Sequence, residues 1–200
     1  PPQMSDTSPQ SYDATTDTIH ASIPLGRIFA VDATSGDRTV LATHDDGNGL
    51  PIPGVSGLAV DGGRLVATDG FLNAILAIDS ETGARTSISD YLVGDGPRPV
   101  GVTFVRADSA HDRVLVNTNQ NPAVLGASFA GGDRAVVADV WVTDLVASAG
   151  QAYAWDISGS IVRVDLDTGS SEIVSSTSVG SGPALPAAGS LALSTDASAL

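Results

Sequence analysis

The sequence contains no cysteine and no lysine, and only two of its 23 carboxylates belong to glutamate. Without cysteine the chain has no disulfide framework, no thiolate nucleophile and no cysteine-based zinc site. Its nine arginines are scattered against a net charge of −14, which opposes binding to nucleic acid or to an acidic bilayer. No apolar run approaches the ~18 residues of a membrane-spanning helix. We therefore expect no nucleic-acid partner and no membrane span.

Aspartate and glycine are abundant instead. Aspartate favours turns whereas glutamate favours helices, and the chain also has 22 glycines, so a nearly all-β structure with many tight turns is predicted. A chain of 200 residues with 42% hydrophobic content can bury the core of one domain. Residues 1–18 are polar and proline-rich and lack any period, which predicts a flexible leader. Such a leader often follows an export signal, so we expect a secreted or periplasmic protein.

Four copies of one short pattern, a strand that runs into a glycine turn and back out, organise the rest of the chain. They read AVDATSGDRTVLA, AIDSETGARTSIS, GASFAGGDRAVVA and RVDLDTGSSEIVS, with turn glycines at Gly36, Gly83, Gly132 and Gly169. The mean spacing of about 44 residues is typical of a four-stranded propeller blade. The sequence therefore predicts an all-β propeller.

The second repeat is the clearest, with strands expected at residues 58–61, 64–68, 74–79 and 85–89, and the next repeat is expected to begin with a strand at residues 101–105. The segment from Thr143 matches the one from Ser56 without a gap. We thus expect about four blades over residues 19–200. The first and the last of them are partial, and the last ends with the strand SLALS at residues 190–194. We expect them to belong to a ring of about six blades. The alternative is a compact four-bladed ring in which the last partial blade completes the first.

The strings GLAVDGGRLVATDGFLNAILAIDSETG and AYAWDISGSIVRVDLDTG resemble blades of the NHL repeat and SMP-30/gluconolactonase group of six-bladed propellers. In the lactonase branch, the resemblance implies a calcium ion held in the central channel by residues just before the glycine that opens each innermost strand. Those positions hold Ser56, Val100, Thr143 and Gly189, which supply no carboxylate or amide side chain. Asp144 follows one place later and is the carboxylate closest to the expected ring.

Candidate ligand-binding residues lie in the loops that follow second and fourth strands, on the face where propellers usually bind ligands. We take His44, Asp69, Asn117 and Asn119 from these loops as weak candidates, against the alternative that they are turn-forming loop residues, and we add Asp144 near the expected channel. Asp32, Asp79 and Asp165 begin hairpins on the opposite face. There their carboxylates are expected to accept backbone N–H groups.

No catalytic residue is identified by these patterns, and whether the chain is an enzyme stays open. The favoured interpretation is an extracytoplasmic propeller that serves as a scaffold or binds a small-molecule or protein partner, with no cofactor and no metal. The alternative is a calcium-dependent lactonase or hydrolase of the SMP-30/gluconolactonase type, with Asp144, Asn119 and Asp69 at the channel.

Overall fold

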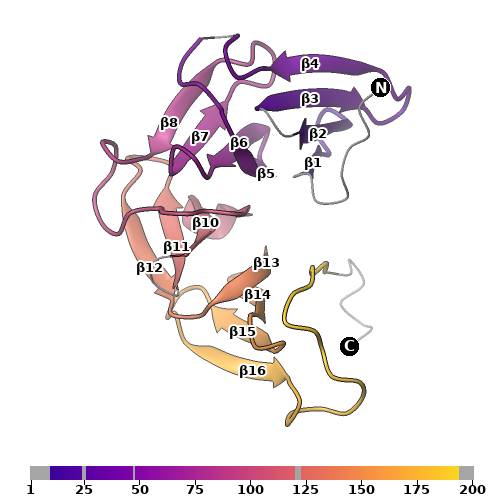
Figure 1. Ribbon diagram of the computed structural model, residues 1–200, viewed down its shortest axis with the longest axis vertical. Coiled ribbons are helices and arrows are strands. Elements are labelled where there is room, and N and C mark those ends of the chain that lie inside the picture. The colour runs from indigo at the N-terminus through magenta and orange to yellow at the C-terminus, as the bar shows by residue number, and fades with distance from the viewer. Residues whose placement is uncertain (1–9, 24–25, 47, 120–122, 194–200) are drawn as a thin grey trace.

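The computed structural model describes residues 10–23, 26–46, 48–119 and 123–193 (Figure 1). These residues form four antiparallel sheets of four strands each and one short 3₁₀ helix, η1, at Ser109–His111. Within each sheet the strands follow in sequence order. The strands are β1 Gln10–Asp13, β2 Thr18–Ile23, β3 Arg27–Asp32, β4 Arg38–Ala42, β5 Val55–Asp61, β6 Arg64–Asp69, β7 Ala74–Ile78, β8 Arg85–Ser89, β9 Val105–Asp108, β10 Arg113–Thr118, β11 Ala123–Ser128, β12 Arg134–Ala138, β13 Val142–Ser148, β14 Gln151–Asp156, β15 Ile161–Asp165 and β16 Ser171–Ser175.

The four sheets are arranged as blades around a common axis. We name them blade A (β1–β4), blade B (β5–β8), blade C (β9–β12) and blade D (β13–β16). The first strands lie innermost, where β5 contacts β1 and β9, and β9 contacts β13. Figure 1 shows the blades fanned into an arc, with the last strands at the periphery. The radial architecture predicted from the repeats is confirmed. No helix in the described ranges has the length and apolar character needed to cross a bilayer.

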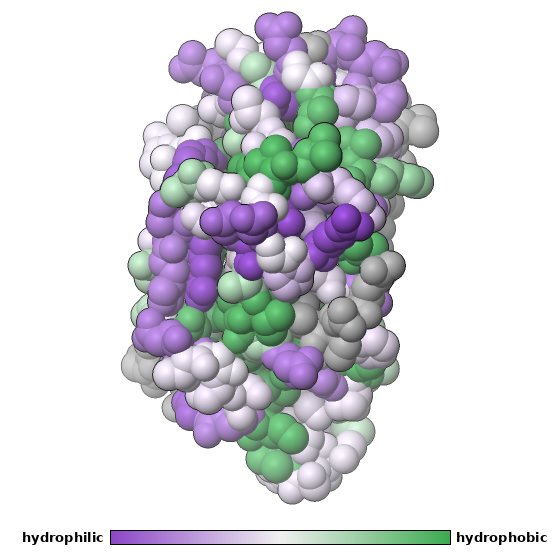
Figure 2. Space-filling model, turned by 90° about the vertical axis from the view of Figure 1, so that its left-hand side faces the viewer, coloured by the Kyte–Doolittle hydropathy of each residue, from purple (hydrophilic) through white to green (hydrophobic). Residues whose placement is uncertain are grey.

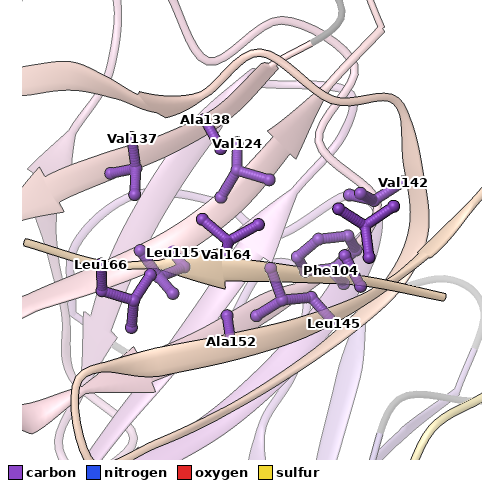
Figure 3. Close-up of a cluster of buried hydrophobic side chains, with 12 residues drawn as sticks. Phe104, Leu115, Val124, Val137, Ala138, Val142, Leu145, Ala152, Val164 and Leu166 are labelled. Carbon is purple, nitrogen blue, oxygen red and sulfur yellow. The ribbon is translucent and has the colours of Figure 1, made fainter. Parts of the chain in front are cut away.

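Hydrophobic cores lie between neighbouring blades. Strands β6 and β10 turn alternate side chains to the preceding and the following blade, so Leu65 packs toward blade A and Val66 toward blade C. Figure 3 shows the cluster between blades C and D, where Leu115 and Val124 face Leu145 and Val164. Burial on both faces explains why the strands read as nearly continuous apolar runs rather than as strict alternation.

The glycine turns have the geometry expected from the sequence. The Oδ1 atom of Asp79 accepts the backbone N–H groups of Glu81 and Thr82 at 3.0 and 2.7 Å. Gly83 then adopts a left-handed φ of 69° and its added Cβ would lie 2.0 Å from the Leu41 carbonyl oxygen, so glycine is required there. These hydrogen bonds lower the pKa of Asp79 below its ordinary value, and equivalent bonds do the same for Asp32 and Asp165.

Three details of the sequence prediction need correction. The predicted leader, residues 1–18, overlaps strand β1, so blade A is complete with four strands rather than partial; residues 1–9 lie outside the described residues. The strand expected at residues 101–105 begins only at Val105. The side-chain oxygen of Asn117 accepts the N–H groups of Thr103 and Phe104, which are therefore not available for strand pairing. Residues 190–193 of the last predicted strand form no strand, and Ser194 is not described.

Candidate binding face

The loops that follow the second and fourth strands of each blade emerge on one face, which we call the upper face. Backbone hydrogen bonds join these loops in pairs at corresponding places of three blades. The N–H groups of Gly70, Asn119 and Ile157 donate to the carbonyls of Gly54, Val100 and Trp141 at 3.2, 3.1 and 3.1 Å. The pairing gives the upper face a fixed framework of loops.

Asp69, a sequence candidate, is fully buried at the end of β6. Its Oδ1 accepts the N–H groups of Phe71 and Leu72 at 2.9 and 3.0 Å, and its Oδ2 accepts that of Gly54 at 2.8 Å. All the bonds hold the β6–β7 turn against the preceding loop. The carboxylate is therefore engaged by the backbone of its own blade.

Asn117, the second candidate, is likewise turned inward. Its Oδ1 accepts the N–H groups of Thr103 and Phe104 at 2.9 and 3.2 Å, and its Nδ2 donates to Thr103 Oγ1 at 2.7 Å. Asn119 is exposed, but its side chain lies so close to Gly101 that a Cβ there would sit 2.0 Å from its Nδ2. Both side chains shape the segment that enters β9.

His44 lies in the β4–β5 loop at the upper face. Its Nε2 is 3.4 Å from an Asp45 carboxylate oxygen, and its side chain is 41% exposed. Among the candidates, His44 is therefore both partly exposed to solvent and adjacent to a carboxylate. Asp69, Asn117 and Asp144 each bond within their own or an adjacent blade, so the structure does not gather the predicted residues into one site.

Asp144, in β13, is buried beside the central channel, where a cavity of about 410 Å³ lies between the innermost strands of the four blades. Arg106 in β9 also lines this cavity and donates from Nη2 to Asp144 Oδ1 at 2.6 Å, linking blades C and D. The other carboxylate oxygen accepts the N–H of Leu191 at 2.9 Å. Apart from Arg106, the cavity is lined mostly by aliphatic residues and by Gln10 and Ser11.

This channel does not fit the calcium ion that the lactonase resemblance implies. A hard cation requires several oxygen ligands, whereas the one carboxylate near the expected ring already has a guanidinium beside it. Ser56 Oγ is also engaged, with the Val102 carbonyl at 2.8 Å. In the described part of the chain, no group of three or more His, Cys, Asp or Glu residues could hold a metal ion.

The opposite, lower face carries ion pairs that tie blades together. His111, in η1, lies with Nδ1 2.9 Å from Asp108 and with Nε2 2.7 Å from Asp167, which belongs to the β15–β16 hairpin of blade D. These two carboxylates raise the pKa of His111. Arg64 contacts Asp61 at 2.6 Å and stacks over the Phe129 ring at 3.8 Å, joining blades B and C. These contacts stabilise blade packing.

A set of large apolar side chains that the sequence patterns did not predict lies exposed in the upper-face loops. We call this set the apolar rim. Phe71 is 79% exposed and Leu92 is 94% exposed. Elsewhere too, apolar patches lie among hydrophilic side chains on the outer side of the molecule (Figure 2). In the sequence, two of the rim residues directly follow an aspartate at or just beyond the end of a strand, because Ile157 follows Asp156 and Tyr91 follows Asp90. The rim consists of Leu50, Phe71, Tyr91, Leu92, Trp141 and Ile157.

Comparisons with known proteins agree on the architecture. The structure is similar to a chain from "Crystal structure of Nidogen/Laminin Complex", with a TM-score of 0.68 and 16% identity over 84% of this chain and 64% of that chain. The chain is a β-propeller domain. It is also similar to the extracellular domain of the hybrid two-component system BT4673 from B. thetaiotaomicron, with a TM-score of 0.58 and 14% identity, covering 82% of this chain and 21% of that chain.

A third similar structure is the N-terminal domain of Nup159, with a TM-score of 0.56 and 10% identity, covering 85% of this chain and 44% of that chain. The propeller described here thus spans less than two thirds of each of these chains. At such low identities the likeness concerns the fold alone. No family model matches the chain, and no curated protein matches it.

Proposed function

We propose that this β-propeller is an extracytoplasmic binding domain that holds a protein partner against the apolar rim of its upper face. The observation that carries the proposal is the exposure of aromatic and leucine side chains at the tips of loops whose backbones are fixed by hydrogen bonds. Exposed apolar patches of this kind typically mark interaction sites, and aromatic anchors supply most of the energy of such contacts.

Rigid loops favour this use of the rim. Gly54 contacts the Phe71 ring so closely that a Cβ at Gly54 would lie 2.2 Å from it. Arg98 lies over the ring of Tyr91 at 3.8 Å, which also restrains that side chain. A side chain that is already held loses little conformational entropy on binding. Two of the polar residues predicted as ligands, Asp69 and Asn117, accept backbone N–H groups of these loops.

The charge of the chain defines the partner further. The upper-face loops carry Asp45, Asp46, Asp95 and Asp139 among a net charge of −14. We infer that the partner presents a basic margin around an apolar centre, because complementary charge steers association and raises its rate at low salt. A partner of that kind would bind more slowly as ionic strength increases.

The placement outside the cytoplasm and the finer family are parts of the same proposal. A secreted or periplasmic location is supported by the extracellular domain among the similar structures. The Asp-x-x-Thr-Gly turns at residues 79–83 and 165–169 favour the six-bladed NHL and SMP-30/gluconolactonase group within the propellers. The lactonase activity of that group is the less favoured function, because Arg106 neutralises Asp144 at the channel.

Site-specific photo-crosslinking tests the proposal. A benzophenone amino acid placed at Leu92, in the rim, is expected to cross-link one discrete protein in the extracytoplasmic fraction of the source cells. The matched control carries the same amino acid at Tyr12, which is 55% exposed and lies in β1 at the lower end of blade A. Phe71→Ser in the Leu92 derivative should abolish the product while leaving the melting temperature unchanged. Equal cross-linking from both positions would refute the proposal.

A further inference from the structure

The hairpin between β11 and β12 of blade C departs from the pattern of the other three blades. All four hairpins close with the same two backbone hydrogen bonds. In blade C the N–H of Ser128 donates to the Asp133 carbonyl and the N–H of Gly132 donates to the Ser128 carbonyl, both at 3.0 Å. The other three hairpins begin with an aspartate at the position of Ser128. Blade C therefore has the same turn without its carboxylate.

In the other blades this carboxylate accepts two backbone N–H groups of its own turn. The Oδ1 atom of Asp165 accepts those of Asp167 and Thr168, the second and third residues after it, at 3.1 and 2.8 Å. Asp32 and Asp79 accept the corresponding N–H groups in blades A and B. Each of these turns therefore binds one carboxylate as part of its own structure.

Serine satisfies the first of these two donors in blade C but not the second. The Oγ atom of Ser128 accepts the N–H of Ala130 at 3.1 Å. The N–H of Gly131 donates to none of the residues that the structure describes. Gly131 is exposed, and a Cβ built on it would meet nothing within 4 Å. Blade C thus has a backbone donor and open space where the other hairpins have a carboxylate.

A cavity of about 310 Å³ lies beside this hairpin, between blades B and C, and Gly131 is part of its lining. Its apolar wall includes Val66 and Ile88, which are 0% and 8% exposed, and the ring of Phe129. Ligand pockets typically have volumes of about 300–1,000 Å³, so this cavity suits a small ligand. Blades B and C each have a neighbouring blade on both sides, so the cavity belongs to a complete junction within the arc.

The side chains at this cavity offer donors rather than carboxylates. Arg64 stacks over the Phe129 ring at 3.8 Å and donates from Nη2 to Asp61 at 2.6 Å and to Asp112 at 3.3 Å. Among the described residues, nothing accepts from its Nε and Nη1 atoms or from the Thr86 hydroxyl. Although the chain has 23 carboxylates, no described residue in the lining is Asp or Glu. A ligand must therefore bring its own acceptor.

We propose that the cavity between blades B and C binds a small apolar carboxylic acid. The ligand carboxylate accepts the N–H of Gly131 and the free donors of Arg64, and the apolar body packs against Val66 and Ile88. A carboxylate is favoured over a neutral acceptor because hydrogen bonds to an ionised group are about twice as strong. This site is separate from the apolar rim and does not require the protein partner proposed there.

The net charge of the chain does not prevent such binding. The charge of −14 repels anions at long range, but at physiological ionic strength this repulsion is screened beyond about 8 Å. Arg64 acts at contact, and its side chain is 48% exposed, so a ligand can reach it. The carboxylates of Asp61 and Asp112 contact a different nitrogen of the guanidinium from those that the ligand would use.

Two-dimensional amide NMR of the full chain titrated with phenylacetate tests the site. The signal of Gly131 is expected to shift and to saturate with a Kd of roughly 1 mM or below. The signal of Thr82, the equivalent residue of blade B, should stay in place because Asp79 already holds it. Phenylacetamide, which lacks the charge, and acetate, which lacks the apolar body, should each bind at least about tenfold more weakly. Absence of a saturable shift at Gly131, or equal affinity for phenylacetate and either analogue, overturns the proposal.

The variant Ser128→Asp supplies the missing carboxylate from the chain itself. It should abolish phenylacetate binding and raise the melting temperature by roughly 2–4 °C, because the Gly131 N–H gains an acceptor. Ser80→Asp is the matched control, since it adds the same charge at an exposed position of the blade B hairpin, and it should bind as the wild type does. A folded Ser128→Asp variant that binds phenylacetate as tightly as the wild type overturns the proposal. If that variant did not fold, the three compounds compared on the wild type would still decide.

Discussion

Replacing Arg134 by methionine tests whether this buried arginine at the start of β12 fastens blade C to the loop that leaves blade B. The substitution keeps an apolar stem of similar length and removes the donors to the carbonyls of Val93, Gly94 and Pro97. Hydrogen bonds from a charged donor contribute about 1.5–3 kcal/mol each, but they are not additive and water can reach part of a surface loop. We therefore expect Arg134→Met to lower the free energy of unfolding by about 3–5 kcal/mol, the range for breaking a buried charged network.

Urea unfolding followed by circular dichroism measures this loss, and hydrogen exchange at residues 92–96 localises it. The control is Arg163→Met, which removes an arginine that is 42% exposed and paired with Glu172. An exposed ion pair contributes about 0–1 kcal/mol, so this variant should remain close to the wild type. If Arg134→Met lost no more stability than Arg163→Met, the hydrogen bonds of Arg134 would not fasten blade C to blade B.

Three further predictions concern pH and metal. The pKa of His111 is raised in the folded state, so the stability that its ion pairs contribute is fully present below about pH 6.5 and is lost as the pH rises through the folded pKa. Urea titrations should therefore show that His111→Asn lowers the free energy of unfolding more at pH 5.5 than at pH 8.5. The reverse order would contradict this. The pKa of Asp79 is lowered in the folded state, so the stability that its hydrogen bonds contribute is present above about pH 4 and is lost as the pH falls through the folded pKa. Asp79→Ala should therefore have a lower melting temperature than Glu81→Ala at pH 7, and the difference should shrink in acid. Millimolar calcium should leave the melting temperature unchanged, whereas a rise of several degrees would indicate a bound ion.

Much of the fold could be predicted because local chemistry repeats in every blade. The turn at Asp79 and Gly83 combines a carboxylate that caps backbone N–H groups with a residue that requires positive φ. Strand β1 was missed because Gln10–Asp13 is short and polar, and it has no apolar alternation to mark it. The late start of β9 was missed because the N–H groups of Thr103 and Phe104 bond to the side chain of Asn117 instead of to a neighbouring strand.

The candidate site was harder to predict because a polar residue in a loop has two uses that look alike in a sequence. The carboxylate of Asp69 could hold a ligand, yet it holds the N–H groups of its own turn. The pairing of Asp144 with Arg106 joins two blades and depends on their packing, which the sequence pattern does not contain. The rim residues were overlooked because exposed Leu92 is distinguishable from a core leucine only once its loop is placed.

The central claim is that Asp69 and Asn117 support the upper-face loops while the apolar rim is exposed and available for binding. Thermal melting of two variants side by side tests it most directly. Asn117→Ala removes three hydrogen bonds beneath β9 and should lower the melting temperature by roughly 4–8 °C, which corresponds to about 2 kcal/mol for a chain of this size. The triple variant Phe71→Ser, Leu92→Ser and Trp141→Ser should melt with the wild type. The opposite ranking, with a stable Asn117→Ala and a destabilised triple variant, would contradict the account.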